Sequence, residues 1–183
     1  MKKILISVRP QWCEKICHVI GKEEAGKPIY EKRIEVRKSA PKEVPFKAYI
    51  YCTKDKPYLY RVDDDNNFEL TNTLRPKTYE YVKDYNEQNG KVIGEFICDK
   101  VFQWKCKKYL ECDGTVIYRY FPLKPDLDKS CLTFRQFHDY GCNKTLYGWH
   151  ISELKIYDKP LLLSELGVTR PPQSYMFVKE VEQ

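Results

Sequence analysis

The sequence lacks long apolar runs, since none approaches the roughly 20 residues that a membrane-spanning helix needs. Its first nine residues begin with a basic end, but only about five apolar residues precede Arg9, too few for a secretory signal peptide. We therefore expect a cytoplasmic protein with no membrane partner.

Glycine and histidine are also scarce, with eight and three residues in a chain of 183. The glycines do not cluster, which argues against a phosphate-binding glycine loop, and no Gly-x-Ser-x-Gly elbow is present. The eight cysteines lack the two-residue spacing of zinc sites, so we expect reduced thiols, with no metal and no cofactor.

What the chain does contain is enough apolar side chain, 42%, for one sizeable core. Its net charge of +6 is unevenly placed. Residues 1–52 hold 12 Lys or Arg and 6 Asp or Glu, whereas residues 53–183 hold 20 of each. This confinement indicates an anionic partner bound by the N-terminal part of the chain.

Hydrophobic periodicity predicts an α+β fold, with about six or seven strands and two or three short helices. Short mixed strands of this kind often close into a small β-barrel. We expect a single domain over 1–183, with an insertion or irregular segment at 55–89. The expected strands are 3–8, 30–38, 46–53, 90–104, 115–121, 149–157 and 174–181, and the expected helices are 10–20, 132–140 and a turn at 160–166.

The basic strand 30–38 is the first candidate for function. Strand alternation places Lys32 with Ile34 and Val36 on the core-facing side, and Arg33, Glu35 and Arg37 on the other. A lysine that is partly desolvated there would serve as a base or a hydrogen-bond donor. The alternative is a solvated edge strand with alternating ion pairs, which is the more common arrangement.

Aromatic residues interleaved with basic ones are the second candidate, because nucleic-acid bases stack on aromatic rings. Trp12 and Trp149 stand out, since each lies beside a turn signal and near a charged or histidine residue. For most of the other aromatic residues, packing in the core is the simpler interpretation.

Several segments together resemble the ASCH domain of the PUA-like superfamily. They are a helix starting at Val8-Arg9-Pro10-Gln11-Trp12, the strand 30–38, Ala48-Tyr49-Ile50-Tyr51-Cys52-Thr53-Lys54 and Gly90-Lys91-Val92-Ile93-Gly94-Glu95-Phe96. The tail from Tyr147 to Ser174 is similar to forms common in Firmicutes and their bacteriophages. The resemblance implies a small barrel with a helix-bordered cleft, lined by Lys32, Glu35 and Arg37, that recognises RNA or a modified nucleoside.

The sequence leaves three functions open. The first is binding of RNA, a nucleotide or a nucleoside by a set of eight residues: Arg9, Trp12, Lys32, Arg33, Glu35, Arg37, Lys38 and Trp149. The second is hydrolysis of RNA or of a modified nucleoside, with Lys32 as base or stabiliser and Glu35 or Glu95 as its partner. Similar enzymes that deacylate N4-acetylcytidine carry a threonine where Glu35 stands. The third is a phage or host protein adaptor that uses the segment 55–89.

Overall fold

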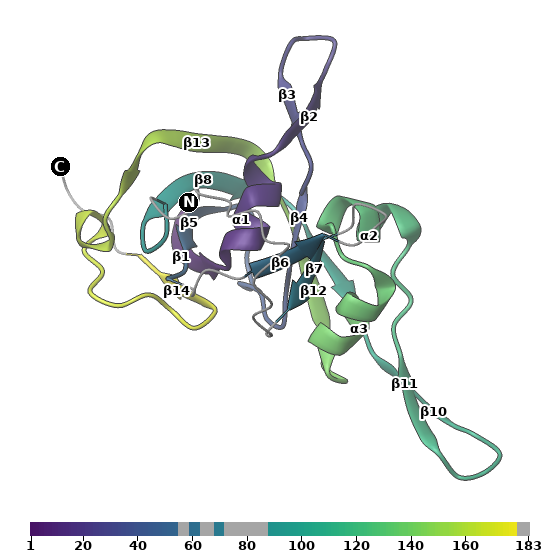
Figure 1. Ribbon diagram of the computed structural model, residues 1–183. Coiled ribbons are helices and arrows are strands. Elements are labelled where there is room, and N and C mark those ends of the chain that lie inside the picture. The colour runs from purple at the N-terminus through teal and green to yellow at the C-terminus, as the bar shows by residue number, and fades with distance from the viewer. Residues whose placement is uncertain (55–58, 63–67, 72–87, 179–183) are drawn as a thin grey trace.

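A computed structural model of the chain describes residues 1–54, 59–62, 68–71 and 88–178 (Figure 1). Within these ranges it has fourteen strands, three α-helices and one 3-10 turn. In chain order they are β1 (Lys2–Val8), α1 (Pro10–Cys17), β2 (Val19–Lys22), β3 (Pro28–Tyr30), β4 (Ile34–Arg37), β5 (Phe46–Cys52), β6 (Leu59–Val62), β7 (Phe68–Thr71), β8 (Val92–Cys98), β9 (Val101–Trp104), β10 (Lys107–Leu110), β11 (Val116–Arg119), α2 (Lys124–Ser130), α3 (Phe134–Gly141), β12 (Leu146–His150), β13 (Ser152–Leu161), the turn Leu163–Leu166 and β14 (Tyr175–Phe177).

The largest sheet has five strands in the order β13-β8-β5-β1-β14. Strand β1 runs parallel to β5 and antiparallel to β14, and β8 is antiparallel to both of its neighbours. Alternate residues of β1 face opposite sides, as strand geometry requires. Ile4 and Ile6 pack with α1 and with Trp149 of β12, whereas Leu5 packs with Val168 after the 3-10 turn.

A second sheet of three strands, in the order β4-β12-β9, carries the basic segment. Ile34 and Val36 of β4 pack with Trp104, Tyr120 and Phe137 in a separate cluster beneath α3. Both sides of β4 are covered, so all four of its residues are buried. This sheet and the helices α2 and α3 lie beside the larger sheet (Figure 1).

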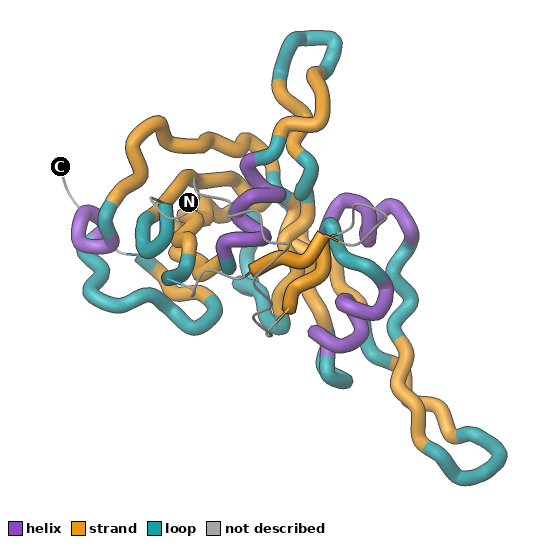
Figure 2. Tube along the Cα trace, viewed as in Figure 1, coloured by secondary structure: helices purple, strands orange, loops and turns teal. Residues whose placement is uncertain are grey.

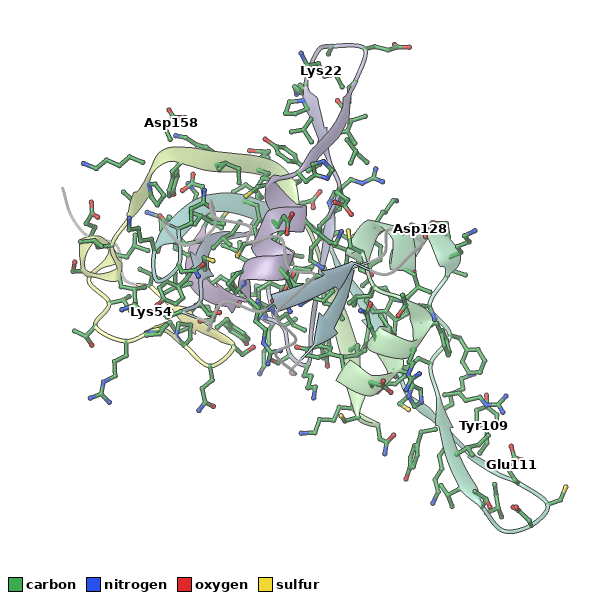
Figure 3. The ribbon with its side chains drawn as sticks, viewed as in Figure 1. Lys22, Lys54, Tyr109, Glu111, Asp128 and Asp158 are labelled. Carbon is green, nitrogen blue, oxygen red and sulfur yellow. The ribbon has the colours of Figure 1, made fainter. Side chains whose placement is uncertain are left out.

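Two hairpins project from the body in different directions (Figure 1; Figure 2). One pairs β2 with β3 and the other pairs β10 with β11, both antiparallel. Figure 3 labels Lys22 on the first and Tyr109 and Glu111 on the second. A third antiparallel pair, β6 with β7, falls inside the predicted insertion 55–89, most of which lies outside the described residues.

Several predicted boundaries were wrong. The first helix ends at Cys17, because Val19–Lys22 pairs with β3 as a strand. The segment 30–38 is interrupted at residues 31–33, and 90–104 splits into β8 and β9. Helix α2, at 124–130, lies where no strand or helix was expected, and β10 pairs with the predicted strand 115–121 as an additional strand.

The α+β class is confirmed, but a closed barrel is not shown. In the described part of the chain, the five-stranded sheet has free edges at β13 and β14, and the other sheets are open as well. None of the helices in the described ranges has the length and apolar character needed to cross a bilayer.

Candidate functional site

The candidate site is built around the interruption between β3 and β4. There the backbone leaves strand geometry and hydrogen-bonds to carbonyls in or next to the last turns of two helices. The amide of Glu31 donates to His18 (2.8 Å), that of Lys32 to Lys15 (3.0 Å) and that of Arg33 to Lys129 (2.7 Å). These hydrogen bonds hold the segment, and with it Lys32, between the ends of α1 and α2.

Three charged side chains of this segment are buried together. Lys32, Glu35 and Arg37 are only 2%, 6% and 6% exposed. One Glu35 oxygen lies 2.9 Å from Arg37 Nε and the other 3.5 Å from Lys32 Nζ. β4 is an edge strand of its sheet, as the alternative from the sequence expected, but the expected solvation is wrong, because all four of its residues are buried.

Backbone carbonyls accept hydrogen bonds from the two cationic side chains, Lys32 and Arg37. Lys32 Nζ donates to the carbonyl of Ser130 at the end of α2 (2.6 Å). Arg37 donates to the carbonyl of Ser7 on β1 (2.7 Å) and, more weakly, to that of Ser174 (3.5 Å). The cluster of Lys32, Glu35 and Arg37 therefore connects β4 to α2, to the larger sheet and to the C-terminal segment.

A pocket of about 460 Å³ opens over this cluster. Its volume is in the range of small-molecule sites. Charged, amide, aromatic and hydroxyl groups converge on it: Ser7, Val8, Arg9, Gln11, Trp12, Lys32, Glu35, Val36, Arg37, Thr53, Leu132, Gln136, Tyr140 and Gln173. Three of these residues are cations and one is an anion, so the lining carries two net positive charges.

The pocket also presents two aromatic side chains. Trp12, in the first turn of α1, is half-buried, and Lys32 Nζ lies 5.2 Å from the centre of its ring. Tyr140, near the end of α3, is 40% exposed, and Lys38 Nζ lies 5.0 Å from its ring centre. Burial raises the pKa of the Tyr140 hydroxyl despite the nearby Arg37, so this group remains a hydrogen-bond donor at neutral pH.

Gln11 supplies a polar atom without a partner. Its side-chain oxygen is buried, yet it accepts no hydrogen bond from the described residues. A buried acceptor of this kind is costly unless something donates to it. Because Gln11 lines the pocket, a ligand that enters there with an N–H or O–H group would satisfy it.

Five of the residues predicted from the sequence meet in this pocket: Arg9, Trp12, Lys32, Glu35 and Arg37. Sequence reasoning missed the three glutamines and Tyr140. No local pattern marks them, since they come from α1, α3 and the C-terminal segment, which only the tertiary structure brings together.

Trp149 does not reach the pocket. It is fully buried in the larger core, with its ring 5.1 Å from that of Phe46 and 5.4 Å from that of Tyr175. A ring enclosed on these sides has no face open to a ligand. The position of Trp149 in the middle strand of the sheet explains why proximity to a turn in the sequence was a poor guide.

Glu95 also lies elsewhere. It is on β8, where Lys47 donates to one carboxylate oxygen (2.7 Å) and the Tyr157 hydroxyl donates to the other (2.7 Å). Both of its oxygens are thus engaged on the larger sheet. The remaining candidates, Arg33 and Lys38, do not line the pocket either. Arg33 is half-buried, and Lys38 is exposed with its amine over the Tyr140 ring.

The cysteines do not form a metal site within the described ranges, where no three Cys, His, Asp or Glu side chains are grouped to hold an ion. All eight cysteines are free thiols. Burial raises the pKa of Cys17 to about 11 and that of Cys98 to about 12, so these thiols are protonated and unreactive at neutral pH.

The fold is similar to solved structures of the ASCH protein from Zymomonas mobilis. The native structure is 16% identical, with a TM-score of 0.54, over 98% of this chain and 89% of that chain. One point mutant of the same protein is 15% identical, with a TM-score of 0.53, over 98% and 92%. A second is 15% identical, with a TM-score of 0.52, over 98% and 89%.

No family model matches the chain, and no curated protein matches it significantly. At the identities of the structural matches, a likeness shows the fold and not the activity. The order of the elements, the buried Lys32–Glu35–Arg37 cluster and the structural matches together lead to one conclusion: this chain has the fold of the ASCH domain proteins.

Proposed function

We propose that this protein binds RNA or a modified nucleoside, with one nucleotide unit held in the pocket over the Lys32–Glu35–Arg37 cluster. The observation that carries the proposal is the convergence of a net positive charge, two aromatic rings and an unpartnered acceptor on one pocket of nucleotide size. The ASCH fold supports it, since the sequence resemblance implies RNA recognition.

The lining offers a partner for each part of a nucleotide. Arg9 is exposed at the mouth, where a guanidinium binds phosphate oxygens in a bidentate manner. Trp12 presents a ring on which a base stacks. The Gln11 oxygen would accept a hydrogen bond from an exocyclic amine or a hydroxyl, and the Tyr140 hydroxyl would donate to a carbonyl.

The buried cluster has a different part in this scheme. Lys32 and Arg37 already donate to backbone carbonyls and form ion pairs with Glu35, so they form the floor of the pocket and contribute its positive potential. The exposed groups at the mouth make the first contact with phosphate. Substitutions at the mouth therefore test binding with less risk to folding than substitutions in the floor.

Calorimetric titration with the four ribonucleoside monophosphates, N4-acetylcytidine and a short single-stranded RNA tests the proposal. We expect binding to weaken about tenfold in Arg9→Gln, and by at least as much in Trp12→Ala. Lys22→Gln, on the projecting β2–β3 hairpin, is the matched control and should bind as the wild type. Absence of binding by every ligand, or equal effects in Arg9→Gln and Lys22→Gln, would contradict the proposal.

Hydrolysis is a second candidate, favoured by one observation. Lys32 Nζ and Glu35 lie 3.5 Å apart in the floor of the pocket, where an ammonium group would stabilise negative charge that develops on a substrate. Glu95 takes no part in this version, because its oxygens are engaged by Lys47 and Tyr157. Turnover of RNA or N4-acetylcytidine that is lost in Lys32→Met, with folding retained, would support it; unchanged turnover would exclude Lys32.

The adaptor function stays a prediction, since most of the segment 55–89 lies outside the described residues. The cytoplasmic location and the bacteriophage resemblance also stay predictions.

A further inference from the structure

A second pocket adjoins the first on the larger sheet. It has a volume of about 930 Å³ and shares three lining residues with the pocket over the charged cluster: Ser7, Thr53 and Gln173. Because the same side chains border both cavities, the two form neighbouring compartments of one surface. We call the first the cationic pocket and the second the adjoining pocket.

The boundary between the compartments is held by hydrogen bonds from β1. The Ser7 hydroxyl donates to the carbonyl of Pro172 (2.6 Å), and the Ser7 amide donates to that of Ser174 (3.1 Å). Arg37 donates to carbonyls of Ser7 and Ser174 from the other side. The charged cluster therefore also positions the C-terminal segment that forms a wall of the adjoining pocket.

The adjoining pocket has a different chemistry. Its walls are mainly apolar, formed by side chains such as Leu163, Val168 and Pro171, with hydroxyls from Ser164 and Thr169. Lys54 is the one charged residue of its described lining. Figure 3 shows Lys54 near the yellow C-terminal segment.

Gly90 makes the position of Lys54 possible. A Cβ at Gly90 would lie 2.5 Å from Lys54 Cε and 2.9 Å from its Cγ, and Gly90 also has a φ of +81°, which favours glycine. The lysine stem thus lies directly against the glycine backbone at this edge of the pocket.

We propose that the adjoining pocket binds the nucleotide next to the one in the cationic pocket, so that the preferred ligand is a single-stranded RNA of at least two nucleotides. This rests on the proposed function. Apolar walls suit a base, the hydroxyls suit a ribose, and Lys54 suits a phosphate. The shared boundary lets one phosphodiester link pass from pocket to pocket.

The test compares one nucleotide with two. The monophosphate that binds best to the cationic pocket is titrated beside dinucleotides that extend it by one uridine on the 5′ or the 3′ side. We expect one of the two dinucleotides to bind roughly tenfold tighter than the monophosphate, because a stacked base adds about that much affinity. Ser164→Trp, which fills the adjoining pocket from an exposed position, should remove this gain and leave the monophosphate affinity unchanged.

Two further variants keep the test decisive. Thr169→Trp fills the same pocket from another exposed position, in case Ser164→Trp does not fold, and Lys54→Gln should reduce the gain without abolishing it. Thr115→Trp and Lys22→Gln, on the two projecting hairpins, are the matched controls and should keep the full gain.

The outcomes separate this inference from the proposed function. If the monophosphate binds but neither dinucleotide binds more tightly, or if the gain survives both tryptophan variants, the adjoining pocket is not a nucleotide site. If N4-acetylcytidine binds but no monophosphate or dinucleotide does, only the inference about the adjoining pocket fails. If none of these ligands and no single-stranded RNA binds, the proposed function itself is wrong.

Discussion

At the scale of single residues, burial decides what a charge does in this protein. Glu35 lies between two buried cations, whereas Glu31, four residues earlier, pairs with Lys15 and His18 near the surface. Buried charges that lose their partner are strongly destabilising, but exposed pairs contribute little. The two glutamates therefore form a matched comparison.

Glu35→Leu should lower the free energy of unfolding by about 3–5 kcal/mol, because it leaves Lys32 and Arg37 buried without their carboxylate. Glu31→Leu should cost about 1 kcal/mol or less, since its side chain is 29% exposed and its partners more so. Urea denaturation measures both values. Equal losses of unfolding free energy in the two variants would show that the buried ion pairs of Glu35 stabilise the protein no more than the exposed pairs of Glu31.

The residue types of the site were partly visible in the sequence. The resemblance implied a common cleft for Lys32, Glu35 and Arg37, whereas strand alternation put Lys32 on the opposite face from the other two. Arg9 and Trp12 were also among the residues predicted to bind the ligand. The burial of Glu35 and Arg37 was not foreseen. Alternation puts successive side chains on opposite faces, but it cannot tell that other elements cover both faces.

At the scale of elements, polar side chains join strands of the larger sheet. Glu95 of β8 accepts hydrogen bonds from Lys47 of β5 and Tyr157 of β13. Burial alone would raise the pKa of Glu95, but these two donors outweigh it and hold the pKa below its usual range. The ionised carboxylate is thus favoured in the folded state.

The pKa of Glu95 is lower in the folded protein than in the unfolded chain. Its stabilising effect is therefore complete at a pH above the pKa of the unfolded chain, and it is lost as the pH falls through the pKa of the folded protein. Between roughly pH 5 and roughly pH 3, the wild type should lose about 1 kcal/mol more stability than Glu95→Gln. Tyr157→Phe, which removes one donor, should fall between them. Parallel pH curves from thermal or urea unfolding would contradict this role.

The central strand of the smaller sheet depends on close packing at Gly148. A Cβ there would overlap the ring of Trp104 and lie 2.9 Å from Ile34 Cγ2. Gly148→Ala should therefore cost about 1–3 kcal/mol of stability, the usual effect of overpacking. Gly21→Ala is the control, since its nearest contact would be 3.9 Å away on an exposed hairpin, and it should be neutral or slightly stabilising. If Gly148→Ala left the stability unchanged, the strand or the Trp104 ring would be able to shift and make room for the added methyl group.

Hydrophobic patterns in the sequence predicted which strands and helices exist better than they predicted where each begins and ends. Dense apolar runs identified β1 and β5 nearly to the residue, since strands of a sheet core are apolar throughout. The hairpin β2–β3 was missed because Val19 and Ile20 also fit the helical spacing of α1. Their segment pairs with β3 instead, and this pairing cannot be predicted from the local sequence.

At the scale of the whole molecule, the charge of the cationic pocket comes from one part of the chain. All charged residues lining the cationic pocket come from the first 52 residues, the part that carries the net +6. The remaining chain is electrically balanced. A pocket lining with three cations and one anion contacts few phosphates at once, unlike a broad basic surface.

The salt dependence of the proposed RNA binding should reflect this small number of phosphate contacts. Two or three neutralised phosphates, contacted by residues such as Arg9 and Lys54, predict a slope of about −1.4 to −2 in a plot of log K against log salt concentration. Fluorescence anisotropy with a labelled single-stranded RNA measures it. A slope far steeper than this would show that RNA runs over a wider surface, and a slope near zero would argue against phosphate contacts altogether.

The sequence by itself determined the fold class, the ASCH resemblance and the position of the charge excess, because apolar periodicity, motif order and composition are local or additive properties. The tertiary structure decided which residues share the pocket. Trp149 lies in the core and Glu95 on the larger sheet, so neither lines the cationic pocket. Four residues that were not predicted do line it: Gln11, Gln136, Tyr140 and Gln173. Convergence of distant segments depends on how sheets and helices pack, and no spacing along the chain encodes it.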